Sequence, residues 1–346
     1  MIAAPPPSDK RELLARCLNR SGAVSFLASL PPRDSLLVFT YHRIGYAGSD
    51  PWDPHVISAT AEEFDDQISF LKRACSVVTL EEALAFIDGE DRSKTPRCRV
   101  LVTFDDGYLD NYQLAYPILR SHGLQGLFFL CSNLVGSGFI PWWDHIAYLV
   151  KSGSRKQFSL DYPICLKVDI DADGLDESLR RINSLYKTFS SVDTGRFLAE
   201  LKEAVSGHEP PAVNRRYLNW AEAREMLAGG MEFGAHTQNH PMLSKLSPED
   251  QFTEISQSRS TIAQQLSARV ETMAYPFGIR AAFTTETERL AEQAGYRAAF
   301  SYYGTETNRK GAIEPYNVKR VPVGSQSSIR LRVQTGIGRL TGSFWP

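Results

Sequence analysis

Short apolar runs alternate with helix-like segments along most of this chain. Eight runs of apolar or alternating residues have the length and the β-branched and aromatic content of strands. They cover residues 36–41, 76–80, 99–104, 126–131, 231–235, 271–275, 297–301 and 319–323. Because strand and helix signals alternate about eight times, the pattern predicts an α/β fold whose parallel strands close into a (β/α) barrel.

The clearest helix signal follows Ser247. Ser247 is a typical N-cap, Pro248 suits the first helical position, and acids follow at positions 249 and 250. Apolar residues then recur at helical spacing, which predicts a helix that packs one face on the barrel. Further helices are expected at residues 61–73, 109–122 and 221–227.

The alternation breaks once, at about residues 137–216. This segment has a polar, strand-like stretch at 158–168 and two helical patterns at 175–189 and 194–205. It predicts a mainly helical insertion in the loop after the fourth strand, and such loops shape the substrate cleft of a barrel enzyme. We therefore expect three parts: an N-terminal helical extension over residues 1–33, a barrel over 34–324 that contains the insertion, and a C-terminal tail over 325–346.

Composition and charge narrow the classes of partner. Of the 346 residues 42% are hydrophobic, which predicts a large buried core. The 38 Lys and Arg residues nearly balance the 40 Asp and Glu residues, and no basic block stands out. This balance argues against nucleic acid as a partner.

Three features predict a cytoplasmic protein. The five cysteines are scattered, the N-terminal residues lack a signal-peptide pattern, and no apolar run approaches the ~18 residues of a membrane span. Apolar positions between residues 11 and 30 could form a helix face, which either docks onto the barrel or makes peripheral contact with a membrane. The oligomeric state has no signature in the sequence.

One motif in the insertion is similar to the start of a calcium-binding loop. Asp169, Asp171 and Asp173 precede Gly174 at the spacing of an EF-hand. The twelfth position, which should be a Glu, is Arg180. We therefore interpret this segment as an acidic, solvated turn.

Two adjacent acids, Asp105 and Asp106, follow the predicted strand 99–104 and precede Gly107. Successive strand side chains point to opposite faces, so the two acids have different roles unless the turn at Gly107 swings one of them round. Their position at the carboxyl end of a strand is where barrel enzymes keep catalytic groups. The alternative is that one of them caps the helix 109–122.

Two histidines, His236 and His240, follow the predicted strand 231–235. Pro241 disfavours helical geometry at His240, so we place the pair on a loop at the same barrel end as the acids. One carboxylate and two imidazoles form a three-ligand metal site with an open position for water. Such a metal lowers the pKa of the bound water from about 15.7 towards about 7, and the second aspartate would accept its proton.

Two further strand ends carry candidate substrate-binding or catalytic groups. Tyr275, Pro276 and Phe277 form a turn whose backbone N–H groups and rings could face a substrate carbonyl and a sugar. His42 ends the strand 36–41 and is either a structural histidine or the general acid for the leaving group.

Two other enzyme classes use related residues. Two histidines and one aspartate are also the facial triad of non-haem iron oxygenases. Glycosidases use paired carboxylates, but these must flank the scissile bond from opposite sides, which adjacent residues are poorly placed to do.

Together these stretches resemble the polysaccharide deacetylase family, also called the NodB-homology domain or carbohydrate esterase family 4. Thr103-Phe104-Asp105-Asp106-Gly107 and His236-Thr237-Gln238-Asn239-His240-Pro241 match its first two motifs. The resemblance implies a distorted (β/α) barrel of seven or eight strands that removes N-acetyl groups from the amino sugars of a glycan. It also implies a divalent metal, most often zinc and otherwise Co, Ni or Mn. Asp105 is then similar to the catalytic base, and Asp106, His236 and His240 to the metal ligands.

The other motifs of the family are altered. Ala274 stands where many members have an Arg that contacts the base, and we expect Arg320 to replace it. No His follows His240, so the usual C-terminal Leu-x-His motif is missing. Members with an N-terminal Thr-Tyr-His strand resemble circularly permuted versions, in which His42 becomes the acid. The expected substrate-binding residues are Tyr108, Trp143, Tyr275, Pro276 and Phe277. Because two motifs are altered, a carbohydrate-binding pseudoenzyme is the alternative.

Overall fold

The computed structural model describes residues 34–46, 51–91, 98–188, 193–213, 215–303, 308–324 and 328–341. The expected N-terminal extension and residues 325–327 and 342–346 of the expected C-terminal tail lie outside the described residues. The chain forms two compact units. The first consists of the chain up to Gly45, Ile57–Gly136 and the chain from Tyr217 onward, and the second of Tyr46–Val56 and Ser137–Arg216.

The first unit is built on a ring of seven parallel strands. Their order is β1 (Ser35–Tyr41), β5 (Cys98–Phe104), β6 (Leu127–Leu130), β9 (Glu232–Ala235), β10 (Thr272–Ala274), β11 (Ala298–Phe300) and β13 (Val321–Pro322). Val318 bridges to Phe300 of β11, and β13 pairs with β1, so the segment from 318 to 322 joins the two ends of the sheet. The predicted barrel is confirmed.

Short strands extend the ring at its margins. β4 (Ser76–Val77) pairs with the start of β5, and β12 (Asn308–Arg309) pairs antiparallel with the start of β1. β2 (Arg43–Ile44) and β3 (Ile57–Ala59) form a separate parallel pair just after β1. The predicted strand 76–80 is therefore only a two-residue strand beside the ring.

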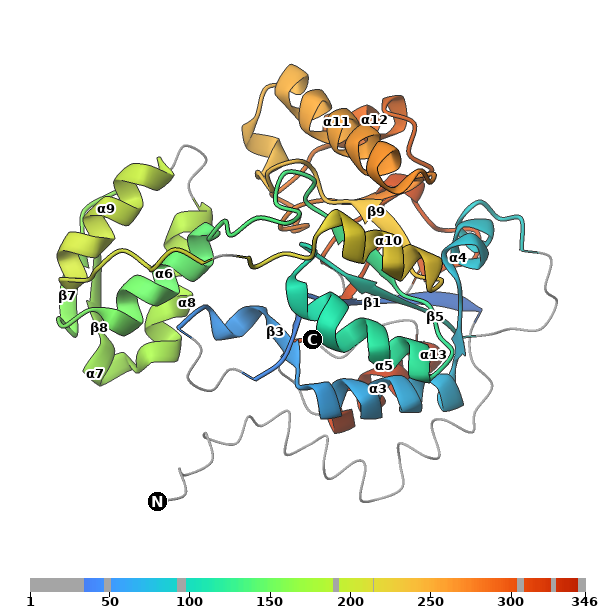
Figure 1. The fold of residues 1–346 in the computed structure, drawn as a ribbon, viewed down its shortest axis with the longest axis horizontal. Helices are drawn as coiled ribbons and strands as arrows, with labels where there is room; N and C mark the ends of the chain where they lie inside the picture. Colours follow the sequence, from blue (N-terminus) through green and yellow to red (C-terminus); the bar gives the residue numbers. More distant parts are fainter. Residues whose placement is uncertain are drawn as a thin grey trace. The chain divides into compact units, whose positions relative to one another are not determined.

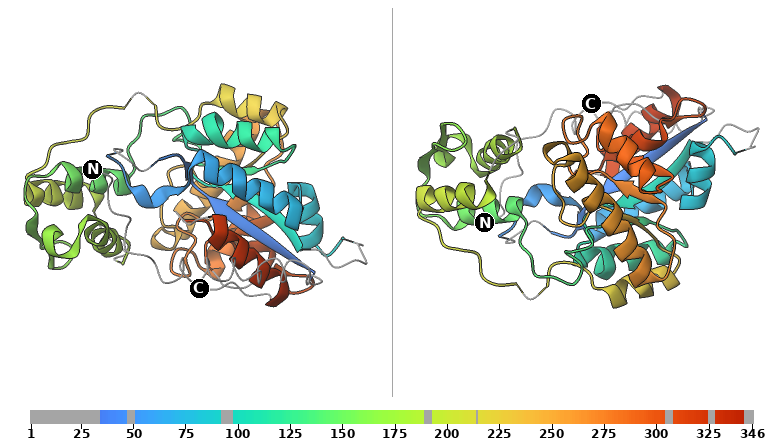
Figure 2. Two further views of the ribbon diagram at one scale, coloured as in Figure 1. Left: turned by 90° about the horizontal axis from the view of Figure 1, so that it is seen from below. Right: turned by 90° about the horizontal axis from the view of Figure 1, so that it is seen from above.

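Helices cover the outside of this ring (Figures 1 and 2). Neighbouring helices pack on one another in two series, from α13 to α3 to α5 and from α10 to α11 to α12. The helices are α3 (Ala61–Ala74), α4 (Leu80–Ile87), α5 (Tyr116–Ser121), α10 (Trp220–Ala228), α11 (Pro248–Leu266), α12 (Thr285–Gln293) and α13 (Ser328–Thr341). The 3₁₀ turns η3 (Leu243–Lys245) and η4 (Pro315–Asn317) lie in loops of this unit.

Local sequence signals explain where these helices begin. Ser247 caps α11 by accepting the N–H of Asp250, as its sequence predicts. The predicted helix 109–122 is confirmed over residues 109–121, where a π-helical turn, η2 (Asn111–Ala115), runs directly into α5. Pro117, in the first turn of α5, lacks the N–H that a regular α-helix would use at that position, which accounts for the π-helical turn before it.

Strand alternation divides the core into two layers. Leu37, Phe39 and Tyr41 of β1 belong to the large apolar cluster between the ring and the helices. Leu36 and Val38 belong to an inner cluster, together with side chains of α4. The same alternation holds in the other strands, so every second residue of a strand faces the interior of the barrel.

The second unit is a small helical assembly with one hairpin. Its elements are η1 (Pro54–Val56), α6 (Trp142–Ser152), β7 (Gln157–Leu160), β8 (Leu166–Asp169), α7 (Ile170–Asp173), α8 (Leu175–Thr188) and α9 (Thr194–Val205). The strand-like stretch 158–168 is the antiparallel pair β7 and β8. Asp169, part of the calcium-like motif, caps α7 by accepting the N–H groups of Asp171 and Ala172.

A buried polar network ties Tyr46–Val56 to the rest of the second unit. The Asp53 N–H donates to Asp144, and the Asn183 amide donates to the Asp53 carboxylate at 2.9 Å. Arg216 pairs with Asp144, and both side chains are almost fully buried. Because each buried charge has a partner, this network is a stable core element of the unit.

None of the helices in the described residues combines the length and the apolar character needed to cross a bilayer.

Candidate active site

Asp105 and Asp106 lie directly after β5, at the carboxyl end of the barrel. Asp105 continues the inward-facing positions of β5, and its N–H donates to the Tyr41 carbonyl at the end of β1. Asp106 would face outward by alternation, but its φ of 71° and the φ of 76° at Gly107 turn it back. The turn therefore places both carboxylates in one site, each almost completely buried.

Left-handed backbone is concentrated around this site. Asp106, Thr237, His240 and Phe277 have φ between 59° and 71°, and the other two non-glycine residues of this kind in the described chain are helix C-caps. Such conformations cost about 1–3 kcal/mol each and persist only where the surrounding contacts impose them. The loops of the site are thus held in conformations that their sequences do not favour locally.

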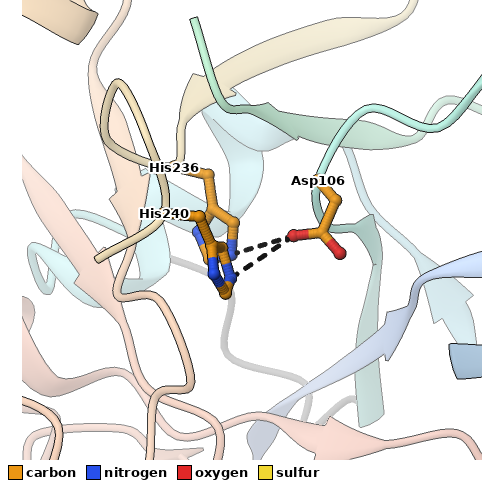
Figure 3. A group of neighbouring side chains, drawn as sticks. All are labelled: Asp106, His236 and His240. Carbon is orange, nitrogen blue, oxygen red and sulfur yellow. Dashed lines mark ion pairs between the residues drawn. The ribbon is translucent and has the colours of Figure 1, made fainter. Parts of the chain in front are cut away.

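Asp106, His236 and His240 converge on one point (Figure 3). Oδ1 of Asp106 lies 3.5 Å from Nε2 of His236 and 3.5 Å from Nε2 of His240. Their ligand atoms all lie within 4.8 Å of one another. Atoms bound at about 2.0–2.2 Å to one tetrahedral ion lie roughly 3.4 Å apart. The spacing therefore fits a single divalent metal.

The protonation of the two imidazoles also suits a metal. Burial holds the pKa values of both histidines below their usual range, and a proton on His236 would further oppose protonation of His240, so the rings are neutral. Nδ1 of His236 lies 2.8 Å from the Ala274 carbonyl, which can only accept a hydrogen bond. The proton is thus on Nδ1, and Nε2 presents its lone pair to the site.

Asp105 is held by Arg320 rather than by the metal-ligand group. Nη1 and Nη2 of Arg320 donate to Oδ1 and Oδ2 of Asp105 at 2.7 and 2.8 Å, and Nε donates to the Ser301 carbonyl. Burial alone would raise the pKa of Asp105, but Arg320, with smaller contributions from His236 and His42, outweighs it and lowers the pKa to about 2. Asp105 is therefore an anion at every physiological pH.

His42 lies directly after β1, half-buried at the same barrel end. Its N–H donates to Ser58 at 3.0 Å, and the Asn111 amide donates to its carbonyl at 2.7 Å. Its ring meets the Tyr302 ring edge to face, with 5.5 Å between the centroids. A positive charge on His42 lowers the pKa of Asp105, so the two side chains are electrostatically coupled.

The predicted substrate-binding residues divide between the site and the core. Phe277 borders the site, since its ring lies 5.2 Å from that of His240, and Pro276 is the buried residue before it. Tyr275 instead points outward, stacks on Phe283 and donates its hydroxyl to the Tyr316 carbonyl. A ring enclosed in this way is not exposed to a substrate.

Tyr108 and Trp143 are also packed side chains. Tyr108 is 1% exposed and stacks on Tyr217. Trp143 belongs to the second unit, where it is 8% exposed and meets Trp142 edge to face. Their burial does not support the predicted contact of either ring with a substrate.

Two residues of the site were not expected from the sequence. Tyr302 follows β11 at an inward-facing position, and its ring contacts both His42 and the Arg320 guanidinium. The same alternation that selects Asp105 could have identified it. Glu254 on α11 contacts the loop between the two histidines, and no sequence signal distinguishes it from other helix acids.

Comparisons with known proteins agree with this geometry. A family model described as polysaccharide deacetylase matches residues 92–299. The protein YxkH of Bacillus subtilis is 20% identical over 294 residues, which cover 85% of this chain and 74% of that protein. The poly-beta-1,6-N-acetyl-D-glucosamine N-deacetylase of Staphylococcus epidermidis is 30% identical over 117 residues, which cover 30% of this chain and 39% of the relative.

Solved structures show the same fold. The Streptococcus pyogenes deacetylase PplD in complex with acetate has a TM-score of 0.56 and 19% identity, covering 88% of this chain and 98% of that one. IcaB from Ammonifex degensii has a TM-score of 0.56 and 20% identity, covering 89% and 100%. Because the family model spans more than half of the chain, the family resemblance is confirmed: this protein belongs to the polysaccharide deacetylase family and is a hydrolase of the carbohydrate deacetylase class.

Proposed function

We propose that this protein is a metal-dependent hydrolase that removes N-acetyl groups from the amino sugars of a polysaccharide. One observation carries the proposal: an ionised carboxylate, Asp105, lies beside a group of one carboxylate and two neutral imidazoles at the carboxyl end of the barrel. Such a pairing of an acid–base group with a metal-ligand group is suited to hydrolysis of an amide.

Asp106, His236 and His240 would hold the metal, with zinc the first candidate and Co, Ni and Mn the others. When bound, the metal acts as a Lewis acid and lowers the pKa of a coordinated water. Asp105 stays outside the ligand group because both of its oxygens are engaged by Arg320.

Asp105 is the proposed general base. Its Oδ2 lies 4.0 Å from Nε2 of His236, which puts it within reach of a water in the site. The low pKa makes it a weak base, so its role is to orient the water and accept a proton only as the bond to carbon forms. Arg320 fixes the orientation of the carboxylate through its two parallel bonds, the role predicted for it from the sequence.

His42 is the proposed general acid. It is half-buried, near enough to Asp105 to affect its pKa, and its ring is held edge to face by Tyr302. Protonation of the leaving amine by an imidazolium is a standard role for histidine near neutral pH. The N–H of Phe277 is the proposed donor to the developing oxyanion, because that residue borders the ligand group.

The substrate class follows from the family and from one relative. The matched relative from Staphylococcus epidermidis acts, by its name, on poly-beta-1,6-N-acetyl-D-glucosamine. We therefore propose a glycan that contains N-acetylglucosamine, and β-1,6-linked oligomers are the first substrate to test.

Acetate release is the direct test. The wild type should release acetate from β-1,6- or β-1,4-linked N-acetylglucosamine oligomers, and a chelator should abolish release until zinc is restored. Asp105→Asn should retain zinc and lose activity, while Asp171→Asn, at an exposed acid of the second unit, should behave as wild type. Zinc binding without acetate release from any acetylated glycan would favour the carbohydrate-binding pseudoenzyme.

A further inference from the structure

The loop that carries the two histidines is held by an acid from a neighbouring helix. Oε2 of Glu254 accepts the N–H groups of Gln238 and Asn239 at 2.8 and 3.1 Å. Oε1 of the same carboxylate accepts Nδ2 of Asn239 at 2.6 Å. All three donors lie between His236 and His240, so one side chain grips the segment that sets the spacing of the proposed ligands.

This loop cannot keep its shape through local preference alone. Thr237 and His240 have φ of 64° and 59°, in the left-handed region, and neither is a glycine. On one side of the loop, the segment after β6 fixes two loop carbonyl groups. The N–H groups of Ser132 and Asn133 donate to the carbonyls of Thr237 and Gln238. Glu254 holds the N–H groups on the opposite side, and the two sets of bonds together impose the turn.

The scaffold behind Glu254 is rigid. The next residue, Ile255, is fully buried, and its carbonyl accepts the Tyr296 hydroxyl at 3.0 Å. One helical turn earlier, Gln251 is buried, donates to the Leu246 carbonyl and accepts the Thr287 hydroxyl. These contacts fix this turn of α11. The carboxylate of Glu254 is therefore presented to the loop from a rigid helix.

We propose that Glu254 is a positioning residue that holds His240 in register with His236 and Asp106 for metal binding. This inference rests on the proposed function. It concerns the loop and not the chemistry, since Glu254 contacts backbone and amide groups between the ligands. By holding the loop before a metal binds, Glu254 removes the cost of ordering it afterwards.

The three hydrogen bonds to the loop require that both side-chain oxygens of Glu254 act as acceptors. An ionised carboxylate only accepts hydrogen bonds, and here it meets three donors. In Glu254→Gln the new NH₂ group must face a donor, either the two backbone N–H groups or Nδ2 of Asn239. Asn239 cannot simply turn over, because its Oδ1 already accepts Nδ2 of Asn133 at 3.0 Å.

These contacts suggest a rescue design. In the double variant Glu254→Gln/Asn239→Asp, the new NH₂ group can donate to the new carboxylate, which still accepts from Asn133. Glu254→Ala removes all three hydrogen bonds to the loop. Glu249→Gln is the matched control, because Glu249 is an exposed acid five positions earlier on the same helix.

Three measurements test the proposal on the full chain. The zinc dissociation constant is measured by competition with a chelating dye, amide hydrogen exchange is followed across residues 236–240 in metal-free protein, and acetate release is assayed with saturating zinc. We expect about 10- to 100-fold weaker zinc binding in Glu254→Gln and Glu254→Ala, with faster exchange in the loop. The double variant should recover part of the affinity, and Glu249→Gln should match the wild type.

The outcomes separate this proposal from the proposed function. Zinc affinity within twofold of wild type in both single variants, with unchanged exchange, overturns the role of Glu254. An equal loss in Glu249→Gln overturns it too, since the effect would then come from the charge of the helix. If the wild type binds zinc but releases no acetate, the proposed function fails while affinity and exchange still decide the role of Glu254.

Discussion

The guanidinium of Arg320 and the carboxylate of Asp105 form a bidentate pair that is closed off from solvent. Arg320 is fully buried, and Asp105 is 2% exposed. The pair joins two strands that are distant in the sequence, since Asp105 follows β5 and Arg320 precedes β13. Two charges in such a place must satisfy each other, because either one alone would be costly to bury.

We therefore predict two separable effects of replacing Arg320. Arg320→Ala should lower the free energy of unfolding by about 3–5 kcal/mol, because it leaves Asp105 buried without its cation. Arg320→Lys keeps the charge but not the planar fork, so acetate release should fall about 100-fold through misplacement of the carboxylate while zinc is retained. Urea unfolding measures the first effect, and the rate of acetate release at verified zinc content measures the second.

The exposed Arg269 provides the control for these variants. Arg269→Ala should change the free energy of unfolding by no more than about 0.5 kcal/mol. Its rate of acetate release should equal that of the wild type. If Arg320→Lys were as active as wild type, the planar fork would have no role in orienting the base.

Strand alternation explains how much of the site could be predicted from the sequence. The inward-facing set that contains Leu36 and Val38 continues to His42, and the set that contains Leu101 continues to Asp105. The same rule places Arg320 inward after Val318 and turns Tyr275 outward with Met273. The burial of the Tyr275 ring in the outer layer therefore does not support its predicted contact with a substrate.

The remaining features depend on tertiary contacts that have no local signature. The inward turn of Asp106 requires a positive φ that only the folded loop imposes. Glu254 resembles any solvent-facing helix acid until α11 docks beside the histidine loop. Similarly, nothing in Tyr46–Val56 indicates that it packs with the insertion, because the contacts of Asp53 link residues far apart in the chain.

Gly107 should be hard to replace, because it lies in the turn that brings Asp106 into the site. A Cβ at this position would lie 2.7 Å from Cδ2 of the buried Leu130, and the φ of 76° is itself unfavourable for other residues. Gly311→Ala is a matched control, because its φ is 78° but no atom lies within 4 Å of the added Cβ. Both variants place an alanine at a positive φ, so the difference between their losses of stability measures the effect of the contact with Leu130.

We expect Gly107→Ala to be destabilised by about 1–3 kcal/mol more than Gly311→Ala in urea unfolding. Zinc affinity should also fall in Gly107→Ala, since displacement of the turn moves Asp106. Equal loss of stability in the two variants would show that the Leu130 side chain moves aside for the added methyl group without destabilising the fold.

The Asp53–His55 pair predicts a pH dependence of stability in the second unit. Nδ1 of His55 lies 2.8 Å from Oδ1 of Asp53. The hydrogen bond to Asp53 raises the pKa of His55, although burial opposes it. Burial would raise the pKa of Asp53, but the bonds from His55 and Asn183 together lower it.

The sign of each contribution follows from these directions. The His55 contribution is fully present below its unfolded pKa of about 6.5 and is lost as the pH rises through the raised folded value. The Asp53 contribution is present above its unfolded pKa of about 3.9 and is lost as the pH falls through the lowered value. The pair should therefore stabilise most between about pH 4 and pH 6.5.

His55→Gln should consequently cost more stability at pH 5 than at pH 8.5. We expect a difference of about 0.5–1 kcal/mol, because the His55 side chain is one-third exposed and solvent screens the pair. His208→Gln, at an exposed position of the same unit, should show no such difference in urea unfolding. If His55→Gln lost the same stability at both pH values, the contribution of His55 to stability would come from packing and not from its charge.

The two aromatic residues of the motif turn should fail in different ways. Tyr275→Phe removes the hydroxyl that donates to the Tyr316 carbonyl, so it should lower the free energy of unfolding by about 1–2 kcal/mol and leave KM unchanged. Phe277→Ala removes the ring beside His240 at the edge of the site, so it should raise KM for the glycan with a smaller loss of stability. Urea unfolding and steady-state kinetics on one oligomer separate the two. A raised KM in Tyr275→Phe would place its ring against the substrate after all.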